Sequence, residues 1–400
     1  MIDLKVARAD AERTRARLAR KGAAEAFDRL LTADERWRAL VPRVDELRSA
    51  TKLKGKPSPE QLEALQQVKE ELREAEEALA TAEAERDAAL AEVPNPPDDS
   101  APDGFTDADA VELRRVGEQP QLAAPREASE IGRFELERAV RLSGSRFGYL
   151  VGDTALLALA LYRFALDHVA RAGFTPVLPP VLVREEAMIG TGFFPTDRAN
   201  IYALEADELF LTGTSEVSLA GMHMGEVLEA DELPIRYAGF STCFRREAGA
   251  AGKDTRGMFR VHQFNKVEMF VFTRPEDSTA EHERMVELEE GLLRALGLPY
   301  RAVNVAAGDL GAPAVKKIDL EAWFPAQGRY REVTSCSNTT DFQARRLGIR
   351  WRAPERGLEA PHTLNGTVVT DRAVLALLEC FQGEVPDVLV PYGAPARVER

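Results

Sequence analysis

The sequence predicts an α+β protein, in which an N-terminal antiparallel helical hairpin precedes a domain with a mainly antiparallel sheet flanked by helices. Up to about residue 92, apolar positions recur at alternating spacings of three and four, the pattern of coiled coils. A stretch rich in proline and aspartate, Val93 to Gly104, interrupts this pattern. Beyond it, short β-rich segments such as 259–273 and 330–338 alternate with helical segments such as 280–297.

Two heptad segments form the expected hairpin. The seam of the first consists of Leu30, Ala33, Trp37, Leu40, Val44, Leu47 and Thr51. The seam of the second consists of Leu65, Val68, Leu72, Ala75, Leu79, Ala82 and Ala89. The intervening "KLKGKPSPE" contains a glycine and two prolines that break a helix, so the two helices should pack antiparallel around it. Pro42 lies inside the first segment and is expected to kink it.

Positive charge gathers near the expected turn of the hairpin, at Arg43, Arg48, Lys52, Lys54 and Lys56. Solubility is the general explanation of a charge run, but a cluster at a turn favours contact with nucleic-acid phosphates. The whole chain carries a formal net charge of -14, which disfavours nonspecific nucleic-acid binding. The acidic total does not exclude a local basic patch, and a DNA partner is not expected.

The sequence indicates a cytoplasmic protein without a membrane segment. Its cysteines are too few for a disulfide framework, and its charged first residues do not resemble a secretion signal. The longest apolar run, residues 154–170, is too short to span a bilayer and carries Arg163 and Asp167. We expect it to form a buried helix that begins at Asp153 and stops at Gly173.

The segment "FRREAGAAGKDTRGMFRVHQFNKVE", from Phe244 to Glu268, concentrates cations in this acidic chain. Read as two strands joined by a glycine-rich loop, it presents one face with Arg245, Glu247, Arg260, His262, Phe264, Lys266 and Glu268. Arginines bind phosphates, an aromatic ring stacks on a base, and a carboxylate binds an ammonium or amino group. The set predicts a site for a nucleotide beside a small amine. The alternative is a ladder of cross-strand ion pairs on a solvated face.

This segment resembles motif 2 of the class II aminoacyl-tRNA synthetases, specifically of the seryl-tRNA synthetases. Thr175 to Val183, "TPVLPPVLV", resembles motif 1, the dimer segment, and His362 to Gln382 resembles motif 3, a strand followed by a helix. The segments "TGTSE" and "YREVTSCSN" resemble the family's serine and metal segments, and the heptad hairpin resembles its tRNA-binding arm. The resemblance covers nearly the whole chain, in the family's order.

The resemblance implies a cytoplasmic homodimer that makes seryl-adenylate from L-serine, ATP and Mg²⁺. The enzyme would then transfer serine to the 3′ end of tRNA(Ser), and of tRNA(Sec) where present. Residues 1–104 would form the tRNA-binding arm and linker, and residues 105–400 the class II catalytic domain. Zinc is not expected, because the histidines and cysteines show no ligand spacing.

The resemblance also implies roles for individual residues. The expected catalytic residues are Arg245, Arg372 and Glu332. L-serine would contact Thr214, Ser215, Glu216, Arg245, Glu268, Asn365 and Thr367. ATP would contact Arg245, Arg246, Glu247, Arg260, Val261, His262, Gln263, Phe264, Glu332, Val333, Thr334, Ser335 and Arg372. Mg²⁺ would be held by Glu332 and Ser335, which supply hard oxygen ligands. The tRNA would contact Arg43, Arg48, Lys52, Lys54 and Lys56.

Departures from the family pattern keep other functions open. Gly213 and Ser215 stand where the family commonly has proline and alanine, and "TDR" around Arg372 replaces a common Gly-Arg pair. A resistance paralogue altered at the pocket rim is one alternative. An amino acid:carrier-protein ligase is another, although such relatives lack the hairpin arm and use zinc. A noncatalytic binding protein is disfavoured, because Arg245, Glu332 and Arg372 are all present.

Overall fold

The computed structural model describes residues 1–52, 58–248 and 257–400. The described chain divides into two compact units, Met1–Pro96 and Pro97–Arg400. The division therefore precedes the boundary expected at residue 104. The physical reason is local docking: the Asp98 amide donates to the Val315 carbonyl at 2.8 Å, and Ala101 is buried against Val305 and Leu310. Composition predicted a linker here but could not show that its second half packs on the second unit.

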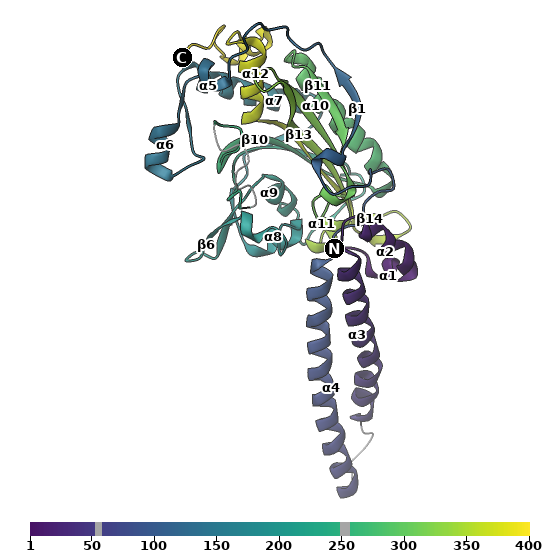
Figure 1. The fold of residues 1–400 in the computed structure, drawn as a ribbon. Coiled ribbons are helices and arrows are strands. Elements are labelled where there is room, and N and C mark those ends of the chain that lie inside the picture. Colours follow the sequence, from purple (N-terminus) through teal and green to yellow (C-terminus); the bar gives the residue numbers. More distant parts are fainter. Residues whose placement is uncertain (53–57, 249–256) are drawn as a thin grey trace. The chain divides into compact units, whose positions relative to one another are not determined.

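The first unit contains four helices among its described residues: α1 (Leu4–Ala9), α2 (Ala11–Ala19), α3 (Ala24–Ala50) and α4 (Pro59–Glu92). Helices α3 and α4 lie side by side and antiparallel, which confirms the predicted hairpin (Figure 1). Buried seam residues include Leu30, Val44 and Leu47 on α3 and Ala82 on α4. Helix α3 continues through Pro42 to Ala50, so the proline does not end it. A capping box at Ser58 starts α4.

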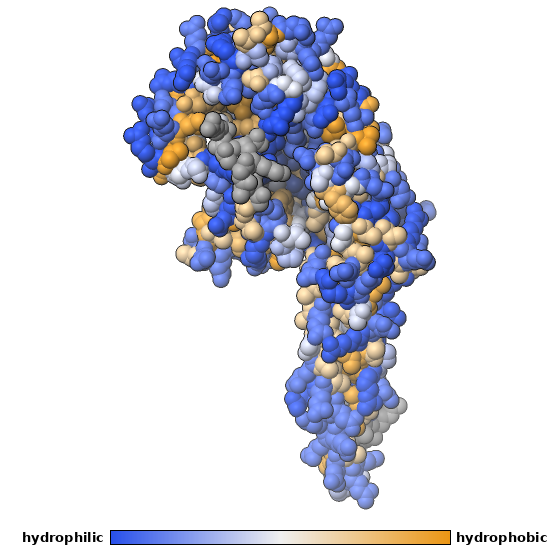
Figure 2. Space-filling view, in the orientation of Figure 1, coloured by the Kyte–Doolittle hydropathy of each residue, from blue (hydrophilic) through white to orange (hydrophobic). Residues whose placement is uncertain are grey.

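The surface of this hairpin is polar. Arg36 pairs with Glu85 at 2.7 Å and Arg29 pairs with Glu92 at 3.0 Å, in each case linking α3 to α4. Figure 2 shows hydrophilic residues over most of the visible face of the hairpin. Exposed ion pairs of this kind add little stability. The buried seam therefore does most to hold the two helices together.

The second unit is built on an eight-stranded sheet of order β1-β11-β12-β13-β16-β10-β9-β4. These strands are β1 (Val111–Val116), β11 (Tyr300–Asn304), β12 (Lys316–Phe324), β13 (Arg329–Thr340), β16 (His362–Thr370), β10 (Gln263–Thr273), β9 (Ile235–Phe244) and β4 (Thr175–Val177). The pairings are antiparallel except that of β4 with β9, which is parallel. The expectation of a mainly antiparallel sheet is confirmed.

Three helices cover one face of this sheet: α7 (Asp153–Arg171), α10 (Ser278–Ala295) and α12 (Asp371–Phe381) (Figure 1). The core includes Leu161 of α7, Met285 of α10 and Leu377 of α12, packed with Val267 and Met269 of β10. The expected buried helix at residues 153–173 and the expected strand and helix of motif 3 are confirmed. Within the described residues, no helix combines the length and the apolar character needed to cross a membrane.

Shorter elements complete the second unit. The helices are α5 (Ala128–Ile131), α6 (Leu136–Ser143), α8 (Glu185–Thr191), α9 (Glu216–Gly221) and α11 (Phe342–Arg346). The strands are β2 (Phe134–Glu135), β3 (Tyr149–Leu150), β5 (Leu182–Val183), β6 (Tyr202–Leu204), β7 (Leu209–Leu211), β8 (Val227–Leu228), β14 (Arg350–Ala353) and β15 (Gly357–Glu359). These strands form three small sheets, β5-β7-β6, β15-β14-β8 and β2-β3.

The predicted strand faces of the 244–268 segment need a correction. Strand β9 ends at Phe244 and β10 begins at Gln263, so residues 245–247 and 260–262 lie outside the strands. Glu247 has a φ of 52°, which is left-handed rather than extended, and the Arg246 amide donates to the Asn200 carbonyl instead of a strand neighbour. Alternation on one face therefore applies only to Phe264, Lys266 and Glu268.

Candidate active site

Two adjoining cavities lie on the sheet face that carries Phe264, Lys266 and Glu268. The first, here called the arginine cavity, has a volume of about 60 Å³ and is lined by Arg245, Arg260 and Arg372 among others. The second, here called the carboxylate cavity, has a volume of about 530 Å³ and includes Glu216 and Glu268 in its lining. The residues common to both linings are Arg245, Lys266, Glu332 and Thr367. A molecule bound in one cavity would therefore reach a molecule bound in the other.

The guanidinium groups of the arginine cavity are held by protein partners. Arg245 Nε donates to the Gly213 carbonyl at 3.2 Å, and its guanidinium carbon lies 5.1 Å from the centre of the Phe264 ring. Arg260 pairs with Glu247 at 2.5 Å. The positive groups are thus aimed into the cavity before any ligand binds, which suits a polyanion.

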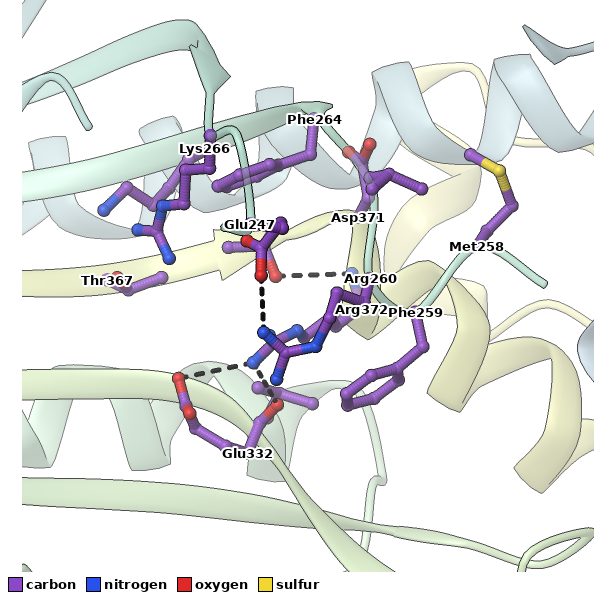
Figure 3. Close-up of a pocket in the computed structure, with 14 residues that line it drawn as sticks. Glu247, Met258, Phe259, Arg260, Phe264, Lys266, Glu332, Thr367, Asp371 and Arg372 are labelled. Carbon is purple, nitrogen blue, oxygen red and sulfur yellow. Dashed lines mark hydrogen bonds and ion pairs between the residues drawn. The ribbon is translucent and has the colours of Figure 1, made fainter. Parts of the chain in front are cut away.

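The opposite wall carries Arg372, which pairs with Glu332 at 3.3 Å and lies 4.6 Å from the centre of the Phe259 ring. Figure 3 shows Phe264 and Lys266 on one side of the cavity and Phe259 and Glu332 on the other. The Arg260–Glu247 ion pair lies in the space between the walls, and Arg372, paired with Glu332 on its own wall, extends into the same space. They explain why so little volume is open between two aromatic rings.

The first turn of α12 fixes Arg372. The Thr370 hydroxyl accepts from the Arg372 amide at 3.3 Å. The buried Asp371 carboxylate accepts from the Tyr162 hydroxyl and, at 3.2 Å, from the Asn265 amide. Burial raises the pKa of Asp371 to about 6, although both hydrogen bonds oppose that rise. Sequence reasoning missed this arrangement, because the Tyr162–Asp371 contact joins positions far apart in the chain.

The carboxylate cavity presents paired acceptors and hydroxyls. Glu216 Oε1 accepts from Gln343 Nε2 at 2.7 Å and from Asn365 Nδ2 at 3.0 Å. Glu268 Oε2 accepts from the Thr367 hydroxyl at 3.0 Å. Two fixed carboxylates among amide and hydroxyl groups suit a small molecule with an ammonium and a hydroxyl. Gln343, on α11, belongs to no motif, so sequence reasoning missed it.

Glu332 and Ser335 both line the carboxylate cavity, and the Glu332 side chain is 48% exposed. Asp319 pairs with Ser335 across β12 and β13, and its Oδ1 is among the buried atoms without a hydrogen-bond partner in the described chain. Mg²⁺ takes one or two protein oxygens together with water and substrate phosphates. Glu332 and Ser335 therefore fit Mg²⁺. The described residues contain no cluster of three or more histidine, cysteine or carboxylate side chains arranged for a metal.

Several expected contacts lie outside the cavity linings. The Arg246 guanidinium lies 5.8 Å from the Tyr202 ring centre, and His262 Nδ1 bonds to the carbonyl of Arg245 at 2.9 Å. Gln263 is an exposed residue at the start of β10. The side chains of Arg246, His262 and Gln263 line neither cavity. Arg246 and His262 lie outside the strands because β9 ends at Phe244 and β10 begins at Gln263.

Thr334 and Ser215 also point away from the cavities. The Thr334 hydroxyl donates to Glu289 of α10 at 2.9 Å, on the opposite face of the sheet. The Ser215 hydroxyl lies 3.4 Å from the Gly239 carbonyl and is buried. Ser215 is one of the departures from the family pattern on which the alternative of a resistance paralogue rests, and its side chain lines neither cavity.

In the first unit, the expected tRNA contacts differ in their surroundings. Arg43 pairs with Glu71 at 2.9 Å, and Arg48 pairs with Glu76 at 2.9 Å. Both arginines therefore join α3 to α4. Lys52 is exposed just after α3, whereas Lys54 and Lys56 lie outside the described residues.

The fold and the site define a class of protein. Residues 202–381 match the family described as tRNA synthetase class II core domain (G, H, P, S and T). All residues that line the arginine cavity, and most of those that line the carboxylate cavity, lie within residues 202–381. The chain therefore has the core of a class II aminoacyl-tRNA synthetase.

Further comparisons specify the family. Residues 1–97 match the seryl-tRNA synthetase N-terminal domain. The serine–tRNA ligase of Acidothermus cellulolyticus is 49% identical, with 98% of this chain and 96% of that protein aligned. That of Mycolicibacterium vanbaalenii is 47% identical, with 98% of each covered. The chain belongs to the seryl-tRNA synthetase family, as the sequence motifs predicted.

Solved structures agree with this assignment. Seryl-tRNA synthetase from Pyrococcus horikoshii, solved with ATP, aligns with a TM-score of 0.93 and 37% identity over 100% of this chain and 99% of its own. The cytoplasmic serine–tRNA ligase of Naegleria fowleri, solved with AMP, gives a TM-score of 0.88 and 32% identity over 97% and 95%. The predicted fold class is confirmed.

Proposed function

We propose that this chain is a serine–tRNA ligase, which activates L-serine with ATP and transfers it to tRNA(Ser), and to tRNA(Sec) where present, in the cytoplasm. The observation that carries the proposal is the pair of adjoining cavities, one rich in guanidinium groups and one in carboxylates, with Arg245 in both linings. Family membership and the close relatives named serine–tRNA ligase support it.

In the proposed activation step, a serine carboxylate oxygen attacks the α-phosphorus of ATP. The bond from that phosphorus to the bridging oxygen breaks, and pyrophosphate leaves with the electron pair. No side chain needs to transfer a proton, so catalysis consists of positioning and charge stabilisation. Arg245 would bridge the serine carboxylate and the α-phosphate, while Arg260 and Arg372 would contact the other phosphates.

The ion pairs across the arginine cavity suggest how ATP would be accommodated. Phosphates would replace carboxylates on Arg260 and Arg372, which releases Glu247 and Glu332. Glu247 would then accept from the adenine amino group, with Phe264 stacked on the base. Mg²⁺, held by Glu332 and Ser335, would supply positive charge beside the phosphate oxygens.

The carboxylate cavity would provide serine specificity. Glu216, Glu268 and Thr214 would hold the ammonium and hydroxyl of serine, with Asn365 and Thr367 closing the pocket. Alanine would leave buried polar groups unpaired, which is a strong basis for rejection. Threonine would be excluded by its additional methyl group.

Pyrophosphate exchange measured with each amino acid, followed by charging of total tRNA, tests this function. Serine alone should support exchange and should then appear on tRNA. Exchange with serine but no transfer to tRNA would favour the carrier-protein ligase. The match of residues 1–97 to the family's N-terminal domain already disfavours that alternative, whose relatives lack the arm.

The affinity for serine is expected to depend on the ionisation of Glu216. Burial raises the pKa of Glu216 to about 7, and the Glu268 charge adds to this rise, while Gln343, Lys266 and Arg245 oppose it. Glu216 is then largely protonated below that pH and cannot attract an ammonium. The KM for serine should therefore fall as pH rises from about 6 to about 8. In Glu216→Gln, the KM should be higher and flat across this range; an unchanged slope would contradict the assignment.

We also propose a homodimer formed through the motif 1 region. Its surface exposes large apolar side chains on neighbouring elements: Leu159 of α7 is 61% exposed and Leu178, between β4 and β5, is 80% exposed. Patches of exposed apolar residues mark interfaces. Leu159→Glu combined with Leu178→Glu should give monomers in analytical ultracentrifugation. Leu358→Glu, at a leucine of β15 that is 57% exposed, is the control and should leave a dimer. A wild-type monomer would refute the proposal.

A further inference from the structure

Lys266 lies at the junction of the two cavities and has no role in the reaction described above. Its ammonium pairs with Glu268 at 2.6 Å, and the two residues are 4% and 2% exposed. It lines the arginine cavity as well as the carboxylate cavity, and Figure 3 shows it beside Phe264 on the wall of the arginine cavity. A buried ammonium at this point needs a functional explanation, because taking it out of water is costly.

The pairing of Lys266 creates a conflict with the proposed serine pocket. Glu268 is assigned to the substrate ammonium, yet it is already neutralised by Lys266. A second ammonium entering this buried site would place two cations on the Glu268 carboxylate. The Glu216 carboxylate of the same cavity is already bonded to Gln343 and Asn365. An excess of positive charge in a buried, low-dielectric site is unfavourable. Lys266 must therefore find another anion when the substrate binds.

Serine brings that anion with it. Its carboxylate is attached to the same carbon as its ammonium, and in the proposed complex it points towards the α-phosphate, at the junction that Lys266 already lines. A lysine has a flexible stem and can rotate between partners, whereas the Arg245 guanidinium is fixed by Gly213 and Phe264. The Lys266 ammonium can thus change partners, whereas the Arg245 guanidinium stays in one position.

We propose, on the basis of the function proposed above, that Lys266 is a further catalytic residue that changes partners during the reaction. The substrate ammonium replaces Lys266 on Glu268, and the Lys266 ammonium then binds the attacking carboxylate and the α-phosphate. There it offsets negative charge as the new oxygen–phosphorus bond forms and the bond to pyrophosphate breaks. This change of partners transfers no proton.

A consequence is selection for molecules that carry both an ammonium and a carboxylate. Serinol, which has the ammonium and hydroxyl of serine but no carboxylate, would displace Lys266 without giving it a new partner. Serinol should therefore bind the wild-type enzyme weakly. Removing the Lys266 charge should abolish this penalty and leave Glu268 free for the cation.

The test is Lys266→Met, which keeps an unbranched side chain one atom shorter than lysine and removes the charge. We expect kcat of serine-dependent pyrophosphate exchange to fall on the order of 100-fold. We also expect serinol to inhibit the exchange more tightly, by about tenfold, which corresponds to about 1.4 kcal/mol. A purely structural role would weaken serine and serinol alike. Weaker or unchanged serinol inhibition would overturn the proposal.

Two further variants keep the result interpretable. Lys317→Met removes another lysine from the carboxylate cavity, one that pairs with Asp319 at 3.2 Å, and it should not tighten serinol binding. Lys266→Met combined with Glu268→Gln removes both charges of the pair and should fold even if the single variant does not. This double variant should show the loss of exchange without the gain in serinol affinity; a gain would contradict the role of Glu268. Absence of serine-dependent exchange in the wild type would instead refute the proposed function itself.

Discussion

Replacing Arg245 with alanine is expected to lower serine-dependent pyrophosphate exchange by about a thousandfold or more. Arg245 lines both cavities, so it alone among the cavity arginines would contact the nucleophile and the electrophile together. Its contacts with the Gly213 carbonyl and the Phe264 ring hold it in place before substrates bind. Loss of a preorganised cation that acts mainly in the transition state should appear chiefly in kcat. Steady-state exchange at saturating serine and ATP measures this effect.

Two companion variants separate charge from geometry. Arg245→Lys keeps a positive charge but loses the planar, bidentate donor, and it should still be impaired by more than tenfold. Arg352→Ala removes an exposed arginine of β14 that pairs with Glu229, and exchange should be nearly unchanged. A mild effect of Arg245→Ala, comparable with that of Arg352→Ala, would remove Arg245 from its assigned position between the substrates.

The fold was predictable where its signal is local and periodic. The heptad seams predicted α3 and α4, because apolar spacing along one helix does not depend on distant contacts. The same holds for α7, whose apolar run ends near Gly173. The end of β9 was not predictable in this way. It is set by the left-handed Glu247 and by the bond from Arg246 to Asn200, a residue distant in sequence.

The site residues were likewise predictable only where the signal is local to one segment of the chain. Residues within motif segments, such as Glu268 and Asn365, were found from the sequence and do line the carboxylate cavity. Gln343 was missed because it reaches Glu216 from an element with no motif. The sequence placed Lys266 among the side chains on one face of a predicted strand but assigned it no role. Its importance emerged from its burial and its position between two cavities, neither of which a sequence pattern shows.

Neutralising the lysines near the hairpin turn is expected to impair tRNA charging while leaving adenylate formation intact. In Lys52→Gln, Lys54→Gln and Lys56→Gln combined, the KM for tRNA should rise by roughly 10- to 100-fold, because in the proposed function each lysine would contact a phosphate of the tRNA. The dependence of the tRNA KM on salt should weaken by roughly one unit of logarithmic slope per lost contact. Serine-dependent pyrophosphate exchange should be unchanged, because it needs no tRNA.

The arginines of the same region provide the matched comparison. Arg43 and Arg48 already pair with Glu71 and Glu76 on the facing helix, so a phosphate would have to compete with these carboxylates. Arg43→Gln combined with Arg48→Gln should therefore raise the tRNA KM less than the lysine variant does, although it removes nearly as much charge. An equal loss in both variants would indicate a general field around the hairpin instead of individual contacts. Equal loss of exchange and charging in the lysine variant would contradict the division between an arm that binds tRNA and a domain that activates serine.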